Sequence, residues 1–162
     1  MFNHQKWFES KKKIANILIL GPYGECKPKL IGLRNYIISR GFENAKLVID
    51  FPDEKYDEIK EDIYFLEKSK NYIKEWAEIL LFVIDQECNN DSVLAEFFYT
   101  VESVNHKIKF TAILASTQRY LGRLLRGTIQ LHRVRLREFS DIGELNRKGY
   151  SAAFNMLQNM KY

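Results

Sequence analysis

Two polar loops carry the residues of this sequence whose types and spacing could do chemistry. Gly21-Pro22-Tyr23-Gly24 follows one apolar run, and residues 85–91 follow another. Two glycines around a Pro-Tyr pair would let the backbone approach a ligand and would offer the ring and hydroxyl of Tyr23, although the same residues also make an ordinary turn. The segment lacks the spacing of a dinucleotide-binding fingerprint and the Lys-Ser/Thr pair of a P-loop. Both interpretations of the turn stay open.

Glu96 is a second candidate, because it interrupts the apolar run at positions 93–98. It lies one helical turn after Ser92, so both side chains share a helix face. Three further polar side chains follow on that face: Tyr99, Thr100 and Ser103. The face is either a solvated stripe, or it holds the Glu96 carboxylate over a crevice beside Asp91, as a nucleophile or as part of an acid–base pair. Asp91 or Ser92 also suits the N-cap of this helix, and capping alone would explain Ser92.

Alternating strands and helices must position these loops. Apolar runs predict strands at 14–20, 45–49, 79–84, 110–114 and 131–139, with the last strand at an edge. Helical spacing predicts helices at 28–41, within 53–74, at 92–104, at 119–126 with Gly127 at its end, and from the capping box Asp141/Glu144 to about Met160. Within 53–74, the predicted apolar stripe has four members: Ile59, Ile63, Leu66 and Ile73.

This alternation predicts one α/β domain with a doubly wound, three-layer architecture of the flavodoxin-like or Rossmann-like kind. Its five-stranded sheet is expected to be mainly parallel, with strand order 2-1-3-4-5. Such sheets bind ligands at the carboxyl ends of the strands where the winding reverses, here between the first and third strands. The two polar loops follow those two strands, so the predicted site lies there.

Charge is distributed unevenly along the 162 residues, whose formal net charge is +4. Residues 1–49 carry +6, residues 50–104 carry −10, and residues 105–162 carry +8. A hydrophobic fraction of 46% excludes a disordered chain. No run reaches the roughly 18 apolar residues of a membrane span, and the N-terminus lacks the apolar core of a signal peptide. We therefore expect a cytoplasmic protein without membrane contact.

The two cysteines, Cys26 and Cys88, are too few for a disulfide scaffold or a four-cysteine zinc site. Both lie in the polar loops and could approach each other if the strand order is right. We interpret them as two unrelated small residues. The alternative is a redox-linked pair, or an adventitious metal site with His106 or His4. No cofactor and no designed metal site are expected.

Six arginines in the basic C-terminal third could contact phosphate or another subunit. Helical spacing places the first three on one face, and strand alternation places the last three on one face. In order, they are Arg119, Arg123, Arg126, Arg133, Arg135 and Arg137. Arginine binds phosphate bidentately, but only Tyr120 and Phe139 offer rings nearby. We therefore favour a homo-oligomer contact with the acidic helix of a second subunit over nucleic acid, which remains the alternative.

The order of these motifs over about residues 14–116 resembles the nucleoside 2-deoxyribosyltransferase-like superfamily. The matching features are the Gly-Pro-Tyr turn after the first strand and Asp85 followed by Asp91-Ser92-x-x-x-Glu96 after the third. The layout is also similar to an uncharacterised archaeal family with the same turn. Residues 1–13 would then form an N-terminal extension to this core, and residues 117–162 a basic helix–strand–helix.

The resemblance implies a role for each of these residues. Gly21, Pro22 and Tyr23 would contact a nucleoside, Asp85 and Asp91 would hold its sugar or base, and Ser92 would lie beside them. Glu96 would be the nucleophile that attacks the anomeric carbon. The expected function is cleavage or transfer at the N-glycosidic bond of a nucleoside or nucleotide by a homodimer or larger oligomer. The alternative is a non-catalytic module on the same fold that binds nucleotide or nucleic acid.

Overall fold

Five parallel strands form one sheet in the order β2-β1-β3-β4-β5. The computed structural model describes residues 3–53, 61–117 and 121–160. The strands are β1 (Ile17–Leu20), β2 (Ala45–Leu47), β3 (Ile79–Ile84), β4 (Thr111–Ala115) and β5 (Arg135–Glu138). The predicted fold class and strand order are confirmed, and every strand pair is parallel. The winding reverses between β1 and β3, as expected.

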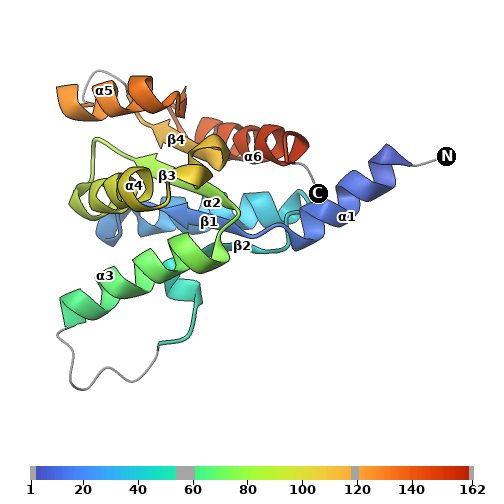
Figure 1. Cartoon of the computed structure of the whole chain (residues 1–162), viewed down its shortest axis with the longest axis horizontal. Helices are drawn as coiled ribbons and strands as arrows, with labels where there is room; N and C mark the ends of the chain where they lie inside the picture. The colour runs from blue at the N-terminus through green and yellow to red at the C-terminus, as the bar shows by residue number, and fades with distance from the viewer. Residues whose placement is uncertain (1–2, 54–60, 118–120, 161–162) are drawn as a thin grey trace.

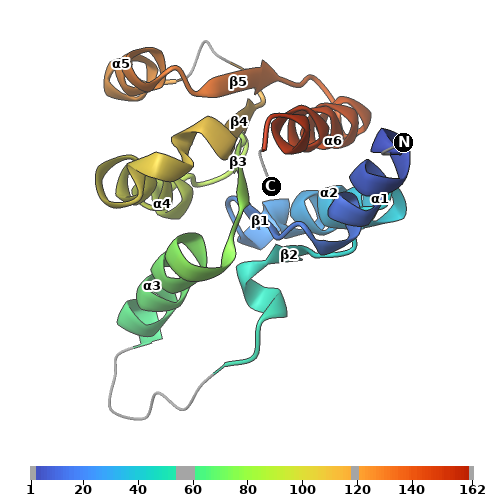
Figure 2. The same cartoon turned by 45° about the vertical axis from the view of Figure 1, so that its right-hand side comes forward.

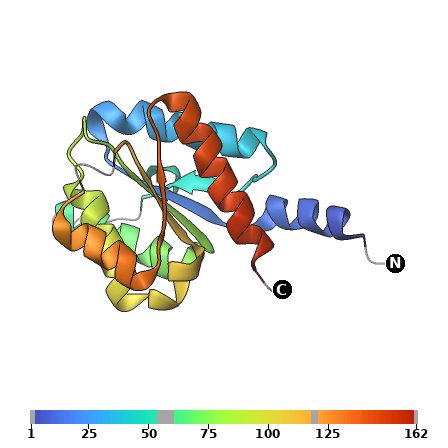
Figure 3. The ribbon, with the colours of Figure 1, turned by 90° about the horizontal axis from the view of Figure 1, so that it is seen from above.

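Helices cover both faces of the sheet, which makes three layers (Figures 2 and 3). Helices α2 (Lys27–Ser39) and α6 (Ile142–Gln158) pack on one face. Helices α3 (Glu61–Asn71), α4 (Asp91–Ser103) and α5 (Arg123–His132) lie on the other. Alternate residues of each central strand point to opposite layers, so that Ile17 joins one core cluster and Leu18 the other. Burial on both faces explains why these strands read as continuous apolar runs.

The predicted N-terminal extension is a helix, α1 (His4–Ile14), which projects from the sheet (Figure 1). The Asn3 side chain caps it by accepting from the backbone N–H groups of Gln5 and Lys6. Phe8 packs edge-on against Phe154 of α6, with ring centroids 4.8 Å apart. The ammonium of Lys12 is buried near the Phe154 ring, so cation–π attraction also holds α1 in place.

The predicted boundaries of α5 and β5 are wrong. Helix α5 begins at Arg123, passes through Gly127 and ends at His132, so residues 131 and 132 belong to the helix and not to the strand. Leu125 and Ile129 are buried against the core, and this packing outweighs the low helix propensity of Gly127. The helix stops at Arg133, whose φ of 53° is left-handed. Strand β5 is an edge strand, as predicted.

The predicted stripe of the acidic helix is also wrong. Tyr64 and Lys68 are the buried residues of α3, whereas Ile63 and Leu66 are half exposed. Ile73 is buried, but it belongs to η3 (Tyr72–Trp76), a π-helical turn that continues the chain towards β3. Ile59 lies outside the described residues. Leu66 and its neighbour Phe65 line a cavity instead of the core, and Ile63 lies outside that cavity.

Candidate functional site

A cavity of about 420 Å³ opens at the carboxyl-end edge of the sheet, where the winding reverses. Its walls come from the turn after β1, from η2 (Val48–Asp50) after β2, from α3, and from the first turns of α4. Most of the lining is apolar, and a small polar group completes it. The polar and charged members are Tyr23, Asp62, Lys68, Ser69, Ser92 and Glu96. An apolar cavity with a few convergent polar groups is the usual form of a small-molecule site.

Glu96 is the most unusual residue of this cavity. Its side chain is only 7% exposed, so the interpretation as a solvated stripe is wrong for this residue. Burial raises the pKa of the Glu96 carboxyl to about 7, although a hydrogen bond with Ser69 opposes the shift. Among the described residues, no Lys, Arg or His forms an ion pair with Glu96. Such a carboxyl exchanges its proton near neutral pH.

Tyr23 lies close enough to sense the charge of Glu96. Loss of hydration, followed by the negative charge of Glu96, raises the pKa of the Tyr23 hydroxyl to about 12. The ring keeps 37% of its surface exposed, while the hydroxyl is placed by hydrogen bonding with the backbone of Ile49 and Val48. Tyr23 therefore stays neutral at physiological pH and can donate a hydrogen bond to a ligand in the cavity.

The α3 wall is the part of the site that sequence reasoning missed. Phe65, Leu66 and Ser69 of this helix face the cavity. Lys68 holds the wall in place, since its ammonium donates to the Phe51 carbonyl and to Asp53, both at 2.8 Å. That ion pair occupies the positive charge of Lys68, which is itself buried. The available signal was the apolar pair Phe65-Leu66 on a helix whose other residues are mostly charged.

Both of the predicted aspartates lie outside this cavity. Asp85 is 2% exposed and forms an ion pair with Lys29 at 2.7 Å, and it lines a separate hollow of about 570 Å³. Asp91 is exposed on the first turn of α4 and does not line the Glu96 cavity. The N-cap of α4 is Asn90, so the prediction that Asp91 or Ser92 caps this helix is wrong. The structure thus brings together Tyr23, Ser92 and Glu96.

Local packing and backbone conformation explain why glycine occupies two positions of the turn after β1. A Cβ at Gly21 would lie 2.5 Å from a methyl group of Leu30, so Gly21 lets α2 pack close to the end of β1. Gly24 has a φ of +75°, a left-handed conformation that favours glycine. Gly21 and Pro22 are buried and absent from the cavity lining. Within this turn, only Tyr23 contributes to the cavity wall.

Cys26 and Cys88 form a disulfide, so the interpretation of two unrelated residues is wrong, as is a metal site with His106 or His4. The bond joins η1 (Gly24–Cys26) to the loop after β3, because strands β1 and β3 are neighbours. It thereby links the loops that lead to Tyr23 and Glu96. Disulfides are typical of oxidising compartments and of hyperthermophile proteins, so the cysteines give no support to a cytoplasmic location. That location stays a prediction.

The predicted arginines divide into two groups, and Arg119 lies outside the described residues. Arg123, Arg126 and Arg137 are exposed on α5 and β5. Arg133 and Arg135 line a groove at the opposite, amino-end edge of the sheet. The homo-oligomer contact stays a prediction.

Two comparisons with known proteins assign this chain to no family. A scan against protein-family models finds no match, and a search of curated proteins finds no significant similarity.

Within the described residues, no cluster of three or more His, Cys, Asp or Glu side chains could hold a metal ion. No helix in the same part of the chain has the length and apolar character needed to cross a bilayer.

Proposed function

We propose that this protein cleaves or transfers at the N-glycosidic bond of a nucleoside or nucleotide, with Glu96 as the nucleophile. The observation that carries the proposal is the buried Glu96 carboxyl, which faces a largely apolar cavity and forms no ion pair with any cation of the described residues, since Lys68 in the cavity wall pairs with Asp53. A poorly hydrated carboxylate is a stronger nucleophile than a solvated one, and the ionised fraction of Glu96 is the form that would react. The motif order that resembles the deoxyribosyltransferase-like superfamily supports the same assignment.

In the proposed reaction, Glu96 Oε bonds to the anomeric carbon while the bond from that carbon to the base nitrogen breaks. The electron pair leaves with the base, which takes a proton from solvent. Water then attacks the anomeric carbon of the glycosyl ester and loses a proton to solvent, while the ester C–O bond breaks and returns Glu96 as a carboxylate. A second base in place of water gives transfer. The apolar side chains Phe65 and Leu66 would pack against the base, and the Tyr23 hydroxyl would donate to the substrate.

The direct test is base release by Glu96→Gln. Gln keeps the size of the side chain but cannot form the ester, so turnover should fall by at least about 10³-fold. The assay follows free base by chromatography from a panel of nucleosides, nucleoside monophosphates and NAD. Glu102→Gln is the matched control, because Glu102 lies on the same helix but is exposed. Full activity of Glu96→Gln, or no base release by the unaltered protein, would contradict the proposal.

A non-catalytic nucleotide-binding module is the second candidate, and the same carboxyl favours it. With a pKa near 7, Glu96 keeps part of its proton at neutral pH and can donate a hydrogen bond to a ring nitrogen. A thermal-shift screen with the same panel separates the two functions. A compound that raises the melting temperature and stays intact supports the module, whereas one that is consumed supports the enzyme.

A further inference from the structure

A basic groove of about 830 Å³ lies at the amino-end edge of the sheet, on the side opposite the Glu96 cavity. It is formed by η4 (Asn105–Phe110), which leads into β4, and by the junction between α5 and β5. Five side chains that are cationic or can become so line this basic groove: His106, Lys109, His132, Arg133 and Arg135. No carboxylate is among the described residues that line it. The groove therefore presents positive charge to solvent.

The charges of this groove are available to a ligand. Lys109 and Arg133 are exposed, and no acidic side chain in the described part of the chain forms an ion pair with either of them or with Arg135. Arg135 donates one N–H to the Lys109 carbonyl, which orients the guanidinium and leaves its other donors. Lys107 differs, since its ammonium is held by three backbone carbonyls at 2.7–2.8 Å. Lys107 is therefore structural.

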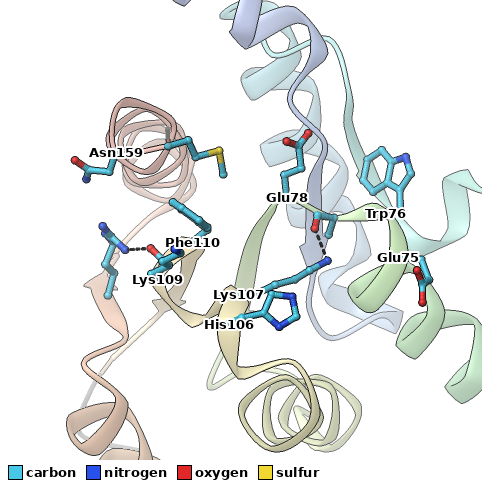
Figure 4. Close-up of a pocket in the computed structure, with 11 residues that line it drawn as sticks. Glu75, Trp76, Glu78, His106, Lys107, Lys109, Phe110 and Asn159 are labelled. Atoms are coloured by element: carbon cyan, nitrogen blue, oxygen red, sulfur yellow. Dashed lines mark hydrogen bonds between the residues drawn. The ribbon is translucent and has the colours of Figure 1, made fainter. Parts of the chain in front are cut away.

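Aromatic rings adjoin the groove. A second hollow, of about 800 Å³, shares His106, Lys109 and Arg135 with it and is also lined by Glu75 and Glu78, whose charges act on Lys107. Figure 4 shows this hollow, with Lys109 and Phe110 coming from η4 and Trp76 from the end of η3. Phe110 and Trp76 are half-buried. A cationic groove that continues into a hollow with aromatic rings combines the two elements of single-strand nucleic-acid binding: phosphate contacts and stacking surfaces for bases.

We infer that the basic groove binds the phosphate backbone of a single-stranded nucleic acid, with a base stacked in the adjoining hollow. The groove is concave, and the strongly exposed apolar side chains of α5, Leu124 and Leu131, do not line it. This distinguishes it from a surface that inserts into a membrane. The acidic helix of a second subunit is the alternative partner for the arginines of this groove, and the test below separates the two. The inference is independent of the proposed reaction at Glu96.

The test measures binding of a fluorescent single-stranded oligonucleotide, 20 thymidines or 20 uridines long, by anisotropy over a series of salt concentrations. The intact protein should bind, with log K falling linearly as log salt rises. The double variant Lys109→Gln/Arg133→Gln should bind at least about tenfold more weakly at low salt. The slope of its log K against log salt should be smaller in magnitude by about 1.4, because two phosphate contacts to a single strand are lost. Melting temperature verifies that it folds.

The matched control is Arg126→Gln/Arg137→Gln, which removes the same charge from exposed arginines outside the groove. It should keep most of the affinity. Equal losses of affinity in both double variants would show that binding depends on net charge and not on the groove, and would overturn the inference. The absence of binding by the intact protein at low salt would also overturn it. A dimer that dissociates in Lys109→Gln/Arg133→Gln but not in the control would overturn it in favour of a subunit interface.

Discussion

At the carboxyl-end edge of the sheet, the Glu96 carboxyl is buried in the cavity wall: the residue is 7% exposed, and burial raises its pKa to about 7. At the amino-end edge, Lys109 and Arg133 stand in solvent around an open groove. Burial changes the chemistry of a single group, whereas exposure leaves several charges to act together on a polyanion. One sheet therefore supports a site suited to reaction at one edge and a surface suited to binding at the other.

The largest expected difference between the two edges concerns the Cys26–Cys88 disulfide, which is present only at the carboxyl-end edge. The bond spans 62 residues of sequence, and loss of that cross-link should lower the free energy of unfolding by roughly 4 kcal/mol through chain entropy alone. Urea unfolding of Cys26→Ser/Cys88→Ser measures this loss. Reductant added to the unaltered protein is the control and should cause a similar decrease.

Hydrogen exchange then compares the edges directly. Without the disulfide, amides in the loops after β1 and β3 should exchange faster, and those of η4 should keep their rates. An unchanged urea midpoint, or equal loss of protection at both edges, would show that the disulfide does not define the carboxyl-end site.

The second difference concerns stability against pH. Because the pKa of Glu96 is higher in the folded protein than in the unfolded chain, the folded state binds more protons, and stability falls as pH rises between about 4.5 and 7. Glu96→Gln removes this loss and should stabilise the protein by on the order of 3 kcal/mol at pH 8, with little effect at pH 4.5. Unfolding curves of Glu96→Gln at both pH values measure the effect. A comparable gain in the free energy of unfolding of the exposed control, Glu102→Gln, would show that the stabilisation comes from the change in net charge.

The smallest expected effect tests whether the edges act independently. Lys109→Gln/Arg133→Gln should leave the pH dependence of unfolding unchanged within about 0.5 kcal/mol, because distant sites without shared partners contribute additively. The measurement repeats the pH series on this double variant and on Glu96→Gln. A shift in the pH range over which the free energy of unfolding falls, which we attribute to Glu96, would show that the two edges are coupled.

The sequence predicts the sheet well, because strands buried on both faces leave an unmistakable apolar signal. The run at 79–84 became β3 with the same bounds, and the strand order follows from short right-handed connections. The boundaries of α5 could not be predicted, since Gly127 is a helix breaker only where packing does not decide. Likewise α1 depends on the rings of α6 and of the loop after α2 that surround the Lys12 ammonium, and local propensity does not reveal these contacts.

The site was predicted in part. The strand order places the turn with Tyr23 and the helix with Glu96 at one edge, as spacing and topology indicate. The pairing of Asp85 with Lys29 could not be predicted, because it depends on how α2 crosses the end of β3. The α3 wall was missed for a related reason: helical spacing identifies an apolar face, but it does not tell whether that face meets a core or a cavity.

The most direct test of the central claim is to trap the ester on Glu96. A 2′-fluorinated nucleoside slows the hydrolysis of a glycosyl ester, because the fluorine withdraws electrons from the developing positive charge at the anomeric carbon. Peptide mass spectrometry of the unaltered protein, incubated with such compounds, should find one sugar attached at Glu96 and release of one equivalent of base. Glu96→Gln should carry no sugar. Turnover of nucleosides without any adduct, or with the sugar on another residue, would contradict the assignment of Glu96 as the nucleophile.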